Sequence, residues 1–377
     1  MWDGLYNRRI HFSFTRKILL KSHDSFYLNL YYEIGHLIKE HFMEPTKKRI
    51  EVLDYLRGFA LLGIIFANIV SIIHVTEHTG NVDIVYMKYL NILVEAKFFS
   101  IFSLLFGIGF YIFFHNAKQK DVNPYFLYLR RILILLLLGL IHQIFQPGEA
   151  LFFYAIVGLP LLLFTFVDKR INLVLGLILL ALGVLSGNKI TFIPGLFILG
   201  YTIGQYDLHK TIYHHARALR ISLLLSTIGF IISMVVLHLY YVAPSYDLVE
   251  STLSNETYVK MYETFSNLIV YTAPFISLFY VLLFVYLLKF DGAKKLLRPL
   301  KYYGQMALTN YLLNTFLIII VGKFVTLTFA QTGLVCVAIL AVQMVFSMIW
   351  LRVFRYGPIE YIWRMGTYLQ VFKIKRS

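Results

Sequence analysis

The amino-acid sequence predicts an all-α polytopic membrane protein, a bundle of about ten transmembrane helices with both termini in the cytoplasm. Three observations lead to this prediction. Of the 377 residues, 59% are hydrophobic and only 15% are charged, whereas soluble domains carry roughly 25% charged residues. Several apolar runs reach about 20 residues, which is enough to cross ~30 Å of hydrocarbon. The basic residues lie between these runs, and their distribution favours one orientation.

Ten apolar stretches are expected to form helices. In chain order they are residues 53–75, 98–115, 131–146, 150–168, 171–187, 190–205, 218–243, 264–289, 303–322 and 333–354. Two of them are short, and we expect these to be tilted, kinked or enclosed by the other helices. The aromatic content, 28 Tyr and 33 Phe, suits interfacial belts and bulky packing between helices.

The positions of the basic residues determine the predicted orientation. With the N-terminus inside, all but five of the 35 Lys and Arg residues fall on the cytoplasmic side. Basic residues are enriched in cytoplasmic loops, so an even number of spans is predicted. The same pattern explains the net charge of +15 without a nucleic-acid partner, and we expect none. The five exceptions are Lys88, Lys97, Lys189, Lys260 and Lys323.

The chain divides into three predicted parts. Residues 1–47 are a basic N-terminal extension, expected to be either an amphipathic surface element or sequence upstream of a natural start at Met43. Residues 48–356 form the transmembrane domain, and residues 357–377 form a cytoplasmic C-terminal segment. The single Cys336 excludes a disulfide within the chain.

One short stretch, LIHQIFQPGEALFFYA at residues 140–155, places polar groups within this apolar sequence. His142 follows Arg131 by eleven residues, or about 16 Å of helix at ~1.5 Å per residue, which puts it in the outer half of the membrane. Pro147-Gly148 is expected to turn the chain, and Glu149 to begin the return helix. Polar groups inside spans usually face the bundle interior or a wet cavity. We therefore predict that His142 is a general base or acid oriented by Glu149; the competing interpretation is hydrogen bonding between helices.

Other polar residues are predicted to reach a similar depth. Asn68 follows Arg57 by eleven residues and is the third predicted catalytic residue, as a hydrogen-bond donor to an oxyanion. Asn68, His142 and Asn314 are expected to converge on one pocket that opens outward. For Asn310 and Asn314, hydrogen bonding between helices is the favoured interpretation. The predicted substrate-binding residues are Arg57, Lys97, Ser100, Ser103, Arg130, Arg131, Tyr154, Asn310 and Asn314.

One short motif bears on metal binding. HVTEH, from His74 to His78, matches the H-x-x-E-H pattern of inverted zincins, in which Glu77 would be the base. No third ligand is apparent, and short motifs have a high rate of false matches. No metal is therefore expected.

Several stretches together resemble the YeiB-like family of bacterial membrane proteins. They are LDYLRGFALLGIIFANI, KFFSIFSLLFGIGFYIF, RRILILLLLGLIHQIF with EALFFYAIVGL, YYGQMALTNYLLNTFL and YGPIEYIWRMGTY, in order over about residues 48–370. In that family Asp usually stands at position 149, so Glu149 is a conservative departure. The resemblance implies membership of a wider transmembrane acyltransferase superfamily that includes lysosomal heparan-α-glucosaminide N-acetyltransferase, to whose start Asp54-x-x-Arg57-Gly58 is similar. The branch that acylates surface sugars has a catalytic His where this chain has Asn68.

The resemblance implies a membrane-embedded acyltransferase. Cytoplasmic acyl-CoA, in the simplest case acetyl-CoA, would give its acyl group to an outward-facing hydroxyl or amine, with His142 as general base. The expected partners are membrane lipids and a small-molecule, lipid or glycan acceptor; a homo-oligomer stays open, and the expected location is the bacterial plasma membrane. The alternative is a transporter or lipid-handling protein that uses the same polar cavity without covalent chemistry. A third interpretation is a non-catalytic scaffold whose polar groups satisfy one another.

Overall fold

The computed structural model of the chain describes residues 50–76, 80–119, 122–211, 215–243 and 255–376. The predicted extension 1–47 and two members of the zincin-like motif, Glu77 and His78, lie outside these residues. The residues from Ile50 onward form one compact unit. In its described part the backbone is helical, apart from connecting loops and two isolated β-bridges, Val75–Leu327 and Phe354–Lys375.

In chain order, the described residues form a series of helices. They are α3 (Glu51–Ile72), α4 (Asn81–Leu93), α5 (Lys97–Lys118), α6 (Pro124–Gln143), α7 (Ala150–Gly158), the 3₁₀ helix η1 (Leu159–Phe166), α8 (Lys169–Leu185), α9 (Ile193–Gln205), α10 (Leu208–Thr211), α11 (Ala216–Leu239), α12 (Asn255–Leu287), α13 (Asp291–Leu296), α14 (Arg298–Gln305), α15 (Ala307–Phe324), α16 (Phe329–Val353) and α17 (Pro358–Tyr368).

Seven helical segments of the described chain are long and apolar enough to cross a membrane. They are α3, the α4–α5 segment, α6, α11, α12, α15 and α16. The segment formed by α7 and η1 and the helix α9 are apolar but shorter. Each of the ten predicted stretches overlaps a helix, while ten membrane crossings and cytoplasmic termini stay predictions.

Two elements differ from the sequence prediction. The prediction omits α4, because Asp83, Lys88 and Asn91 interrupt its apolar residues. The stretch 303–322 is not one helix, and its predicted start is wrong. Instead α14 ends at Gln305 and α15 begins at Ala307, since Met306 has φ −109° and ψ 37° and leaves the helical conformation.

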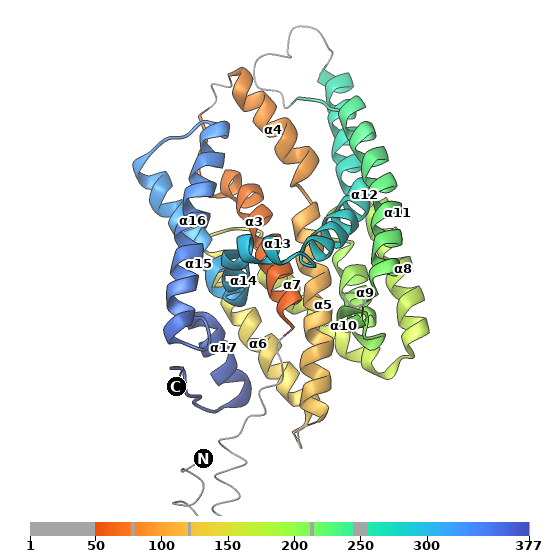
Figure 1. Cartoon of the computed structure of the whole chain (residues 1–377). Coiled ribbons are helices and arrows are strands. Elements are labelled where there is room, and N and C mark those ends of the chain that lie inside the picture. Colours follow the sequence, from red (N-terminus) through yellow and green to blue (C-terminus); the bar gives the residue numbers. More distant parts are fainter. Residues whose placement is uncertain (1–49, 77–79, 120–121, 212–214, 244–254, 377) are drawn as a thin grey trace, which may run out of the picture. The chain divides into compact units, whose positions relative to one another are not determined.

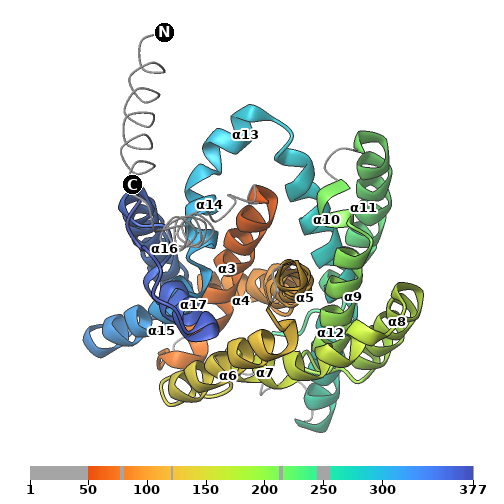
Figure 2. The same cartoon turned by 90° about the horizontal axis from the view of Figure 1, so that it is seen from below.

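The helices α3 and α5 lie in the interior of the bundle (Figures 1 and 2). On one side of them lie α15, α16 and α17, and on the other lie α8, α9, α11 and α12. The helix α3 contacts α5, α14, α15 and α16. A close crossing joins α5 and α9, where a Cβ on Gly107 would stand 2.1 Å from the Phe197 carbonyl oxygen. Small residues of this kind let membrane helices approach closely.

The outer faces of α8 and α11 expose long rows of aliphatic side chains. Leu182, Leu224 and Leu225 are 60%, 68% and 66% exposed. Contiguous apolar surface of this extent is rare on soluble monomers. Such apolar faces are stable in the hydrocarbon interior of a membrane, because they do not contact water there.

The break between α14 and α15 is stabilised by α17. The Glu360 carboxylate accepts hydrogen bonds from the N–H groups of Leu308 (2.7 Å) and Thr309 (3.0 Å), and from the Thr309 hydroxyl. The first N–H groups of a helix have no partner within that helix. Glu360 therefore supplies the acceptors that allow α15 to start at this point of the bundle.

Glu360 predicts a pH dependence of stability. Desolvation raises the pKa of its carboxyl above the ordinary value, although the hydrogen bonds from α15 offset part of the effect. Between the unfolded pKa, ~4.3, and the raised folded value, the folded state binds more protons, so stability falls as pH rises. We expect the thermal unfolding temperature of the wild type, relative to Glu360→Gln, to increase as pH is lowered from 7 to 5. Parallel curves for the two proteins would contradict this expectation.

Candidate functional site

The turn between α6 and α7 carries Glu149 to the start of α7. Gly148 has a φ of 76°, a left-handed conformation that glycine adopts without strain. Glu149 then occupies the N-cap position of α7, where its carboxylate accepts hydrogen bonds from the N–H groups of Leu151 (2.8 Å) and Phe152. Side-chain acceptors at this position satisfy donors that the helix leaves free. The predicted turn and return helix are therefore both present.

A glycine on α6 brings the two helices together. A Cβ on Gly139 would stand 2.5 Å from the Phe152 nitrogen and 2.8 Å from the Glu149 Oε1. The absence of a side chain at Gly139 thus lets the start of α7 lie directly against α6. His142 is three residues further along α6, on the same face of the helix, and points at Glu149.

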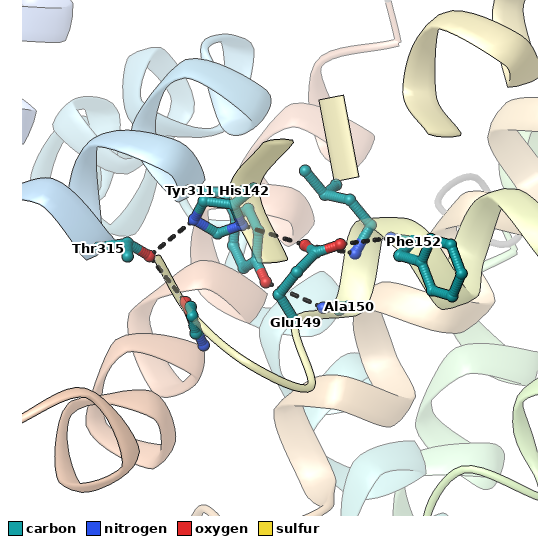
Figure 3. A network of polar contacts seen from close by, with 8 residues as sticks. His142, Glu149, Ala150, Phe152, Tyr311 and Thr315 are labelled. Carbon is teal, nitrogen blue, oxygen red and sulfur yellow. Dashed lines mark hydrogen bonds and ion pairs between the residues drawn. The ribbon is translucent and has the colours of Figure 1, made fainter. Parts of the chain in front are cut away.

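The imidazole of His142 is held on both sides. Its Nδ1 lies 3.1 Å from the Glu149 Oε2, and its Nε2 lies 2.9 Å from the Thr315 Oγ1 on α15 (Figure 3). The Thr315 hydroxyl in turn donates to the Gln146 Oε1 (2.7 Å). The Tyr311 ring meets the imidazole edge to face at 5.3 Å, and its hydroxyl accepts from the Ala150 N–H (3.1 Å). We call His142, Gln146, Glu149, Tyr311 and Thr315 the His142 network.

The His142 network is almost completely removed from solvent. His142 is 2% exposed, Glu149 is 1% exposed and Thr315 is 1% exposed. A carboxylate at such a depth is stable only when hydrogen-bond donors surround it. Glu149 has two backbone N–H donors and the imidazole, so the carboxylate and the ring hold each other in one fixed orientation.

The network contains three residues that the sequence analysis did not assign to the site: Gln146, Tyr311 and Thr315. Gln146 lies one turn beyond His142, and Tyr311 and Thr315 lie one turn apart on α15. The 3.6-residue period of a helix would have placed each pair on one face. Nothing local in the sequence indicates that the α15 pair faces α6.

The three side chains predicted to converge do not share one hydrogen-bond network. Asn68 is half-buried, and within the described residues its side chain has no hydrogen bond to the His142 network. Asn310 donates to the Tyr303 carbonyl and to the Ser347 hydroxyl, both 2.9 Å away, and so faces α14 and α16. The amide of Asn314 is buried beside the Tyr303 hydroxyl, and within the described residues it makes no hydrogen bond to the His142 network.

The predicted serines and tyrosine of α5 and α7 form a second, separate contact. The hydroxyls of Ser103 and Tyr154 lie 2.7 Å apart, and both also bond to the Phe99 carbonyl. The Tyr154 ring packs among aromatic side chains of α5 and α9. Ser100 donates to the Ala96 carbonyl (2.6 Å). These contacts are those of helix packing within the core.

Lys97 is fully buried at the start of α5. Its Nζ donates to the Asn91 carbonyl (3.0 Å), and its own carbonyl accepts from the Ser277 hydroxyl. These two hydrogen bonds tie α4, α5 and α12 together. They do not reach Glu149, which is bound by His142.

Arginines gather where α3, α5, α6 and α17 meet. Arg57 pairs with Asp54 at 3.1 Å, and a Cβ on Gly109 of α5 would stand 3.8 Å from its Nη2. The Arg131 guanidinium lies over the Trp363 ring (3.5 Å) and the Phe113 ring (4.8 Å). The charges of Arg57 and Arg364 both act on Arg131. Arg130, by contrast, is exposed.

The described residues contain no group of three or more His, Cys, Asp and Glu side chains that would hold a metal ion. His74 lies just beyond the end of α3, while its motif partners fall outside the described chain. The His142 network itself presents an imidazole, a carboxylate and a hydroxyl.

The fold and the apolar outer faces define a class, the polytopic helical membrane proteins. The family model described as "Protein of unknown function (DUF418)" matches residues 203–370. The chain belongs to this YeiB-like family of membrane proteins.

Three curated relatives match over nearly their whole length. The chain is 40% identical over 339 residues to the "Uncharacterized 39.9 kDa protein in amylase 3'region" of Bacillus acidopullulyticus, covering 88% of this chain and 98% of that protein. It is 26% identical to "Uncharacterized protein YxaH" of Bacillus subtilis (86% and 95% covered) and 24% identical to "Uncharacterized protein YeiB" of Escherichia coli (85% and 96%). No solved structure matches the chain.

Proposed function

We propose that this protein is a membrane-embedded acyltransferase of the bacterial plasma membrane, within the wider transmembrane acyltransferase superfamily. It moves an acyl group from cytoplasmic acyl-CoA to an outward-facing hydroxyl or amine. His142 is the general base. In this proposal the chain crosses the membrane ten times and both termini are cytoplasmic.

The observation that carries the proposal is the orientation of His142. Its Nδ1 is fixed on the buried Glu149 carboxylate, which directs Nε2 toward a hydroxyl oxygen 2.9 Å away. A base must lie within hydrogen-bond reach of the proton that it accepts. A neutral ring with its Nδ1–H held by the carboxylate has its lone pair on Nε2, which is the arrangement that proton abstraction from a hydroxyl requires. The ring reaches this arrangement when the Thr315 hydroxyl turns its proton from Gln146 toward Nε2.

In this proposal, arginines bind the phosphate groups of the acyl-CoA donor. Guanidinium groups bind phosphate oxygens through paired hydrogen bonds, and acyl-CoA carries a pyrophosphate and a 3′-phosphate. Arg57 and Arg364 both lie close enough to Arg131 for their charges to act on it. Arg131 and His142 lie on the same helix, about 16 Å apart at ~1.5 Å per residue, so α6 would join the phosphate-binding end to the reacting end.

Thioester turnover by the purified protein tests the proposal. We expect the protein in lipid nanodiscs to release free thiol from acetyl-CoA, and His142→Ala to lower the rate by roughly 10²–10⁴-fold, the usual contribution of general base catalysis. His238→Ala is the matched control, because His238 is an exposed histidine on the apolar helix α11. No thiol release by the wild type, or equal rates in wild type and His142→Ala, would refute the acyltransferase.

A second candidate function is solute or lipid transport. The break between α14 and α15 favours it, since discontinuous membrane helices commonly form transport sites. The amide of Asn314 and the hydroxyl of Tyr303 are buried polar groups close to this break. Solute-dependent proton movement in proteoliposomes, in the absence of thioester turnover, would select this alternative.

A further inference from the structure

The Thr315 hydroxyl bonds outside its own helix, as do the hydroxyls of Ser277 and Thr309, whereas many others in this protein bond within theirs. Ser and Thr side chains inside membrane helices usually donate to the carbonyl four residues earlier in the same helix. Thr315 instead bonds Gln146 and His142, both on another segment. The hydroxyls that do follow the usual pattern include those of Ser100, Ser103, Thr202, Ser233 and Thr272.

The three side chains stand in the order hydroxyl, imidazole, carboxylate. Thr315 comes from α15, His142 from α6 and Glu149 from the N-cap of α7, and the two contacts measure 2.9 Å and 3.1 Å. This order is the one that activates serine and threonine nucleophiles on unrelated folds, where it is recognised by geometry and not by sequence position. We infer that Thr315 is the nucleophile that first receives the acyl group. The inference rests on the proposed function.

The side chain of Gln146 allows two hydrogen-bond arrangements in the triad formed by Thr315, His142 and Glu149. In the first, the Thr315 hydroxyl donates to the Gln146 Oε1, and the imidazole donates from both nitrogens, to Thr315 and to Glu149. A half-turn of the Gln146 amide presents its NH₂ to the Thr315 oxygen. The hydroxyl proton then points to the His142 Nε2, and Thr315 is ready to attack. This second arrangement leaves the imidazole neutral, with its remaining proton on the Glu149 side.

The reaction proceeds in two balanced halves. The Thr315 oxygen attacks the thioester carbonyl while its proton passes to the His142 Nε2. The carbon–sulfur bond breaks, the thiolate takes that proton, and free thiol leaves an ester on Thr315. In the second half an acceptor hydroxyl or amine gives its proton to His142 and attacks the ester. The ester carbon–oxygen bond breaks, and the Thr315 oxygen recovers the proton.

A covalent intermediate suits a site reached from opposite membrane faces. Donor and acceptor would occupy the region around His142 in turn, so the network need not hold both at once. Ping-pong kinetics is the expected signature of such an intermediate.

The test follows the acetyl group. Purified protein in nanodiscs is incubated with radiolabelled acetyl-CoA without acceptor, and the label is mapped by peptide mass spectrometry. We expect an acetyl ester on residue 315 in the wild type and in Thr315→Ser, and none in Thr315→Val. Thiol release in Thr315→Val should fall at least ~10³-fold, as expected for removal of a triad nucleophile. Thr272→Val is the matched control, because the Thr272 hydroxyl bonds to the Leu268 and Ile269 carbonyls of its own helix.

The possible outcomes separate the two proposals. Turnover by Thr315→Val within a few-fold of the wild type would overturn the nucleophile and leave His142 acting directly on the acceptor. A stable label on His142 or any residue other than Thr315, or turnover without label at residue 315, would also overturn it. No turnover by the wild type would overturn both the nucleophile and the acyltransferase.

Discussion

Glu149→Gln is expected to lower thioester turnover by roughly 10³–10⁴-fold, the loss that follows when the carboxylate of a catalytic triad becomes an amide. The amide oxygen still caps α7, so the fold should survive. The amide NH₂ facing the His142 Nδ1, however, makes that nitrogen an acceptor and moves the ring proton to Nε2. The imidazole then has no lone pair toward Thr315 or an acceptor hydroxyl.

The measurement is thiol release from acetyl-CoA across pH, with the thermal unfolding temperature as the control for folding. Glu149→Asp is the conservative partner, since Asp is among the strongest N-cap residues and keeps a carboxylate near the imidazole. It should retain most of the turnover that Glu149→Gln loses. Equal activity of the Gln variant and the wild type would show that Glu149 does not set the proton position on His142.

Gly304→Ala is expected to destabilise the protein by roughly 3 kcal/mol or more, because it inserts a methyl group between two backbones. A Cβ at Gly304 would stand 1.9 Å from the Asp54 carbonyl oxygen and 2.5 Å from the Gly58 nitrogen. Backbone atoms cannot rotate away as a side chain does, so α14 must move off α3. This shift would also separate the Gln305 amide of α14 from the Asp54 carboxylate of α3.

Gly292→Ala is the control for this substitution. Gly292 lies in α13, and no atom stands within 4 Å of the position that a Cβ would take there. Alanine at this position should be neutral or stabilise by up to about 1 kcal/mol, the difference in helix propensity. Thermal unfolding of both variants in one detergent gives the comparison. Similar unfolding temperatures would contradict a backbone contact at Gly304.

Much of the fold follows from the local pattern of the sequence. Apolar runs locate the helices, and Pro147-Gly148 followed by Glu149 locates the α6–α7 turn, because turn and cap residues act on their own neighbours. The start of α15 did not follow, since Met306 carries no glycine or proline signal. What holds that break is Glu360, more than fifty residues later in the chain.

In the candidate site, the depth of a residue along its helix is not enough to predict which side chains it contacts. Asn314 and Thr315 lie at nearly the same depth, but adjacent residues point about 100° apart around a helix. Because their depths agree, the sequence predicts that Asn314 lies with His142. The contacts instead join Thr315 to His142. Which face of α15 meets α6 depends on packing across 173 residues of sequence, and no local pattern encodes that rotation.

The helix α15 is anchored at two points along its length, by Glu360 at its first turn and by His142 at Thr315. Anything that loosens the first anchor would let the helix rotate about its axis and carry the hydroxyl away from the imidazole. In the proposed mechanism, chemistry within the bundle is therefore mechanically linked to a carboxyl on α17, beyond the last long span. A proton or a cation arriving there would alter reactivity without entering the reacting region.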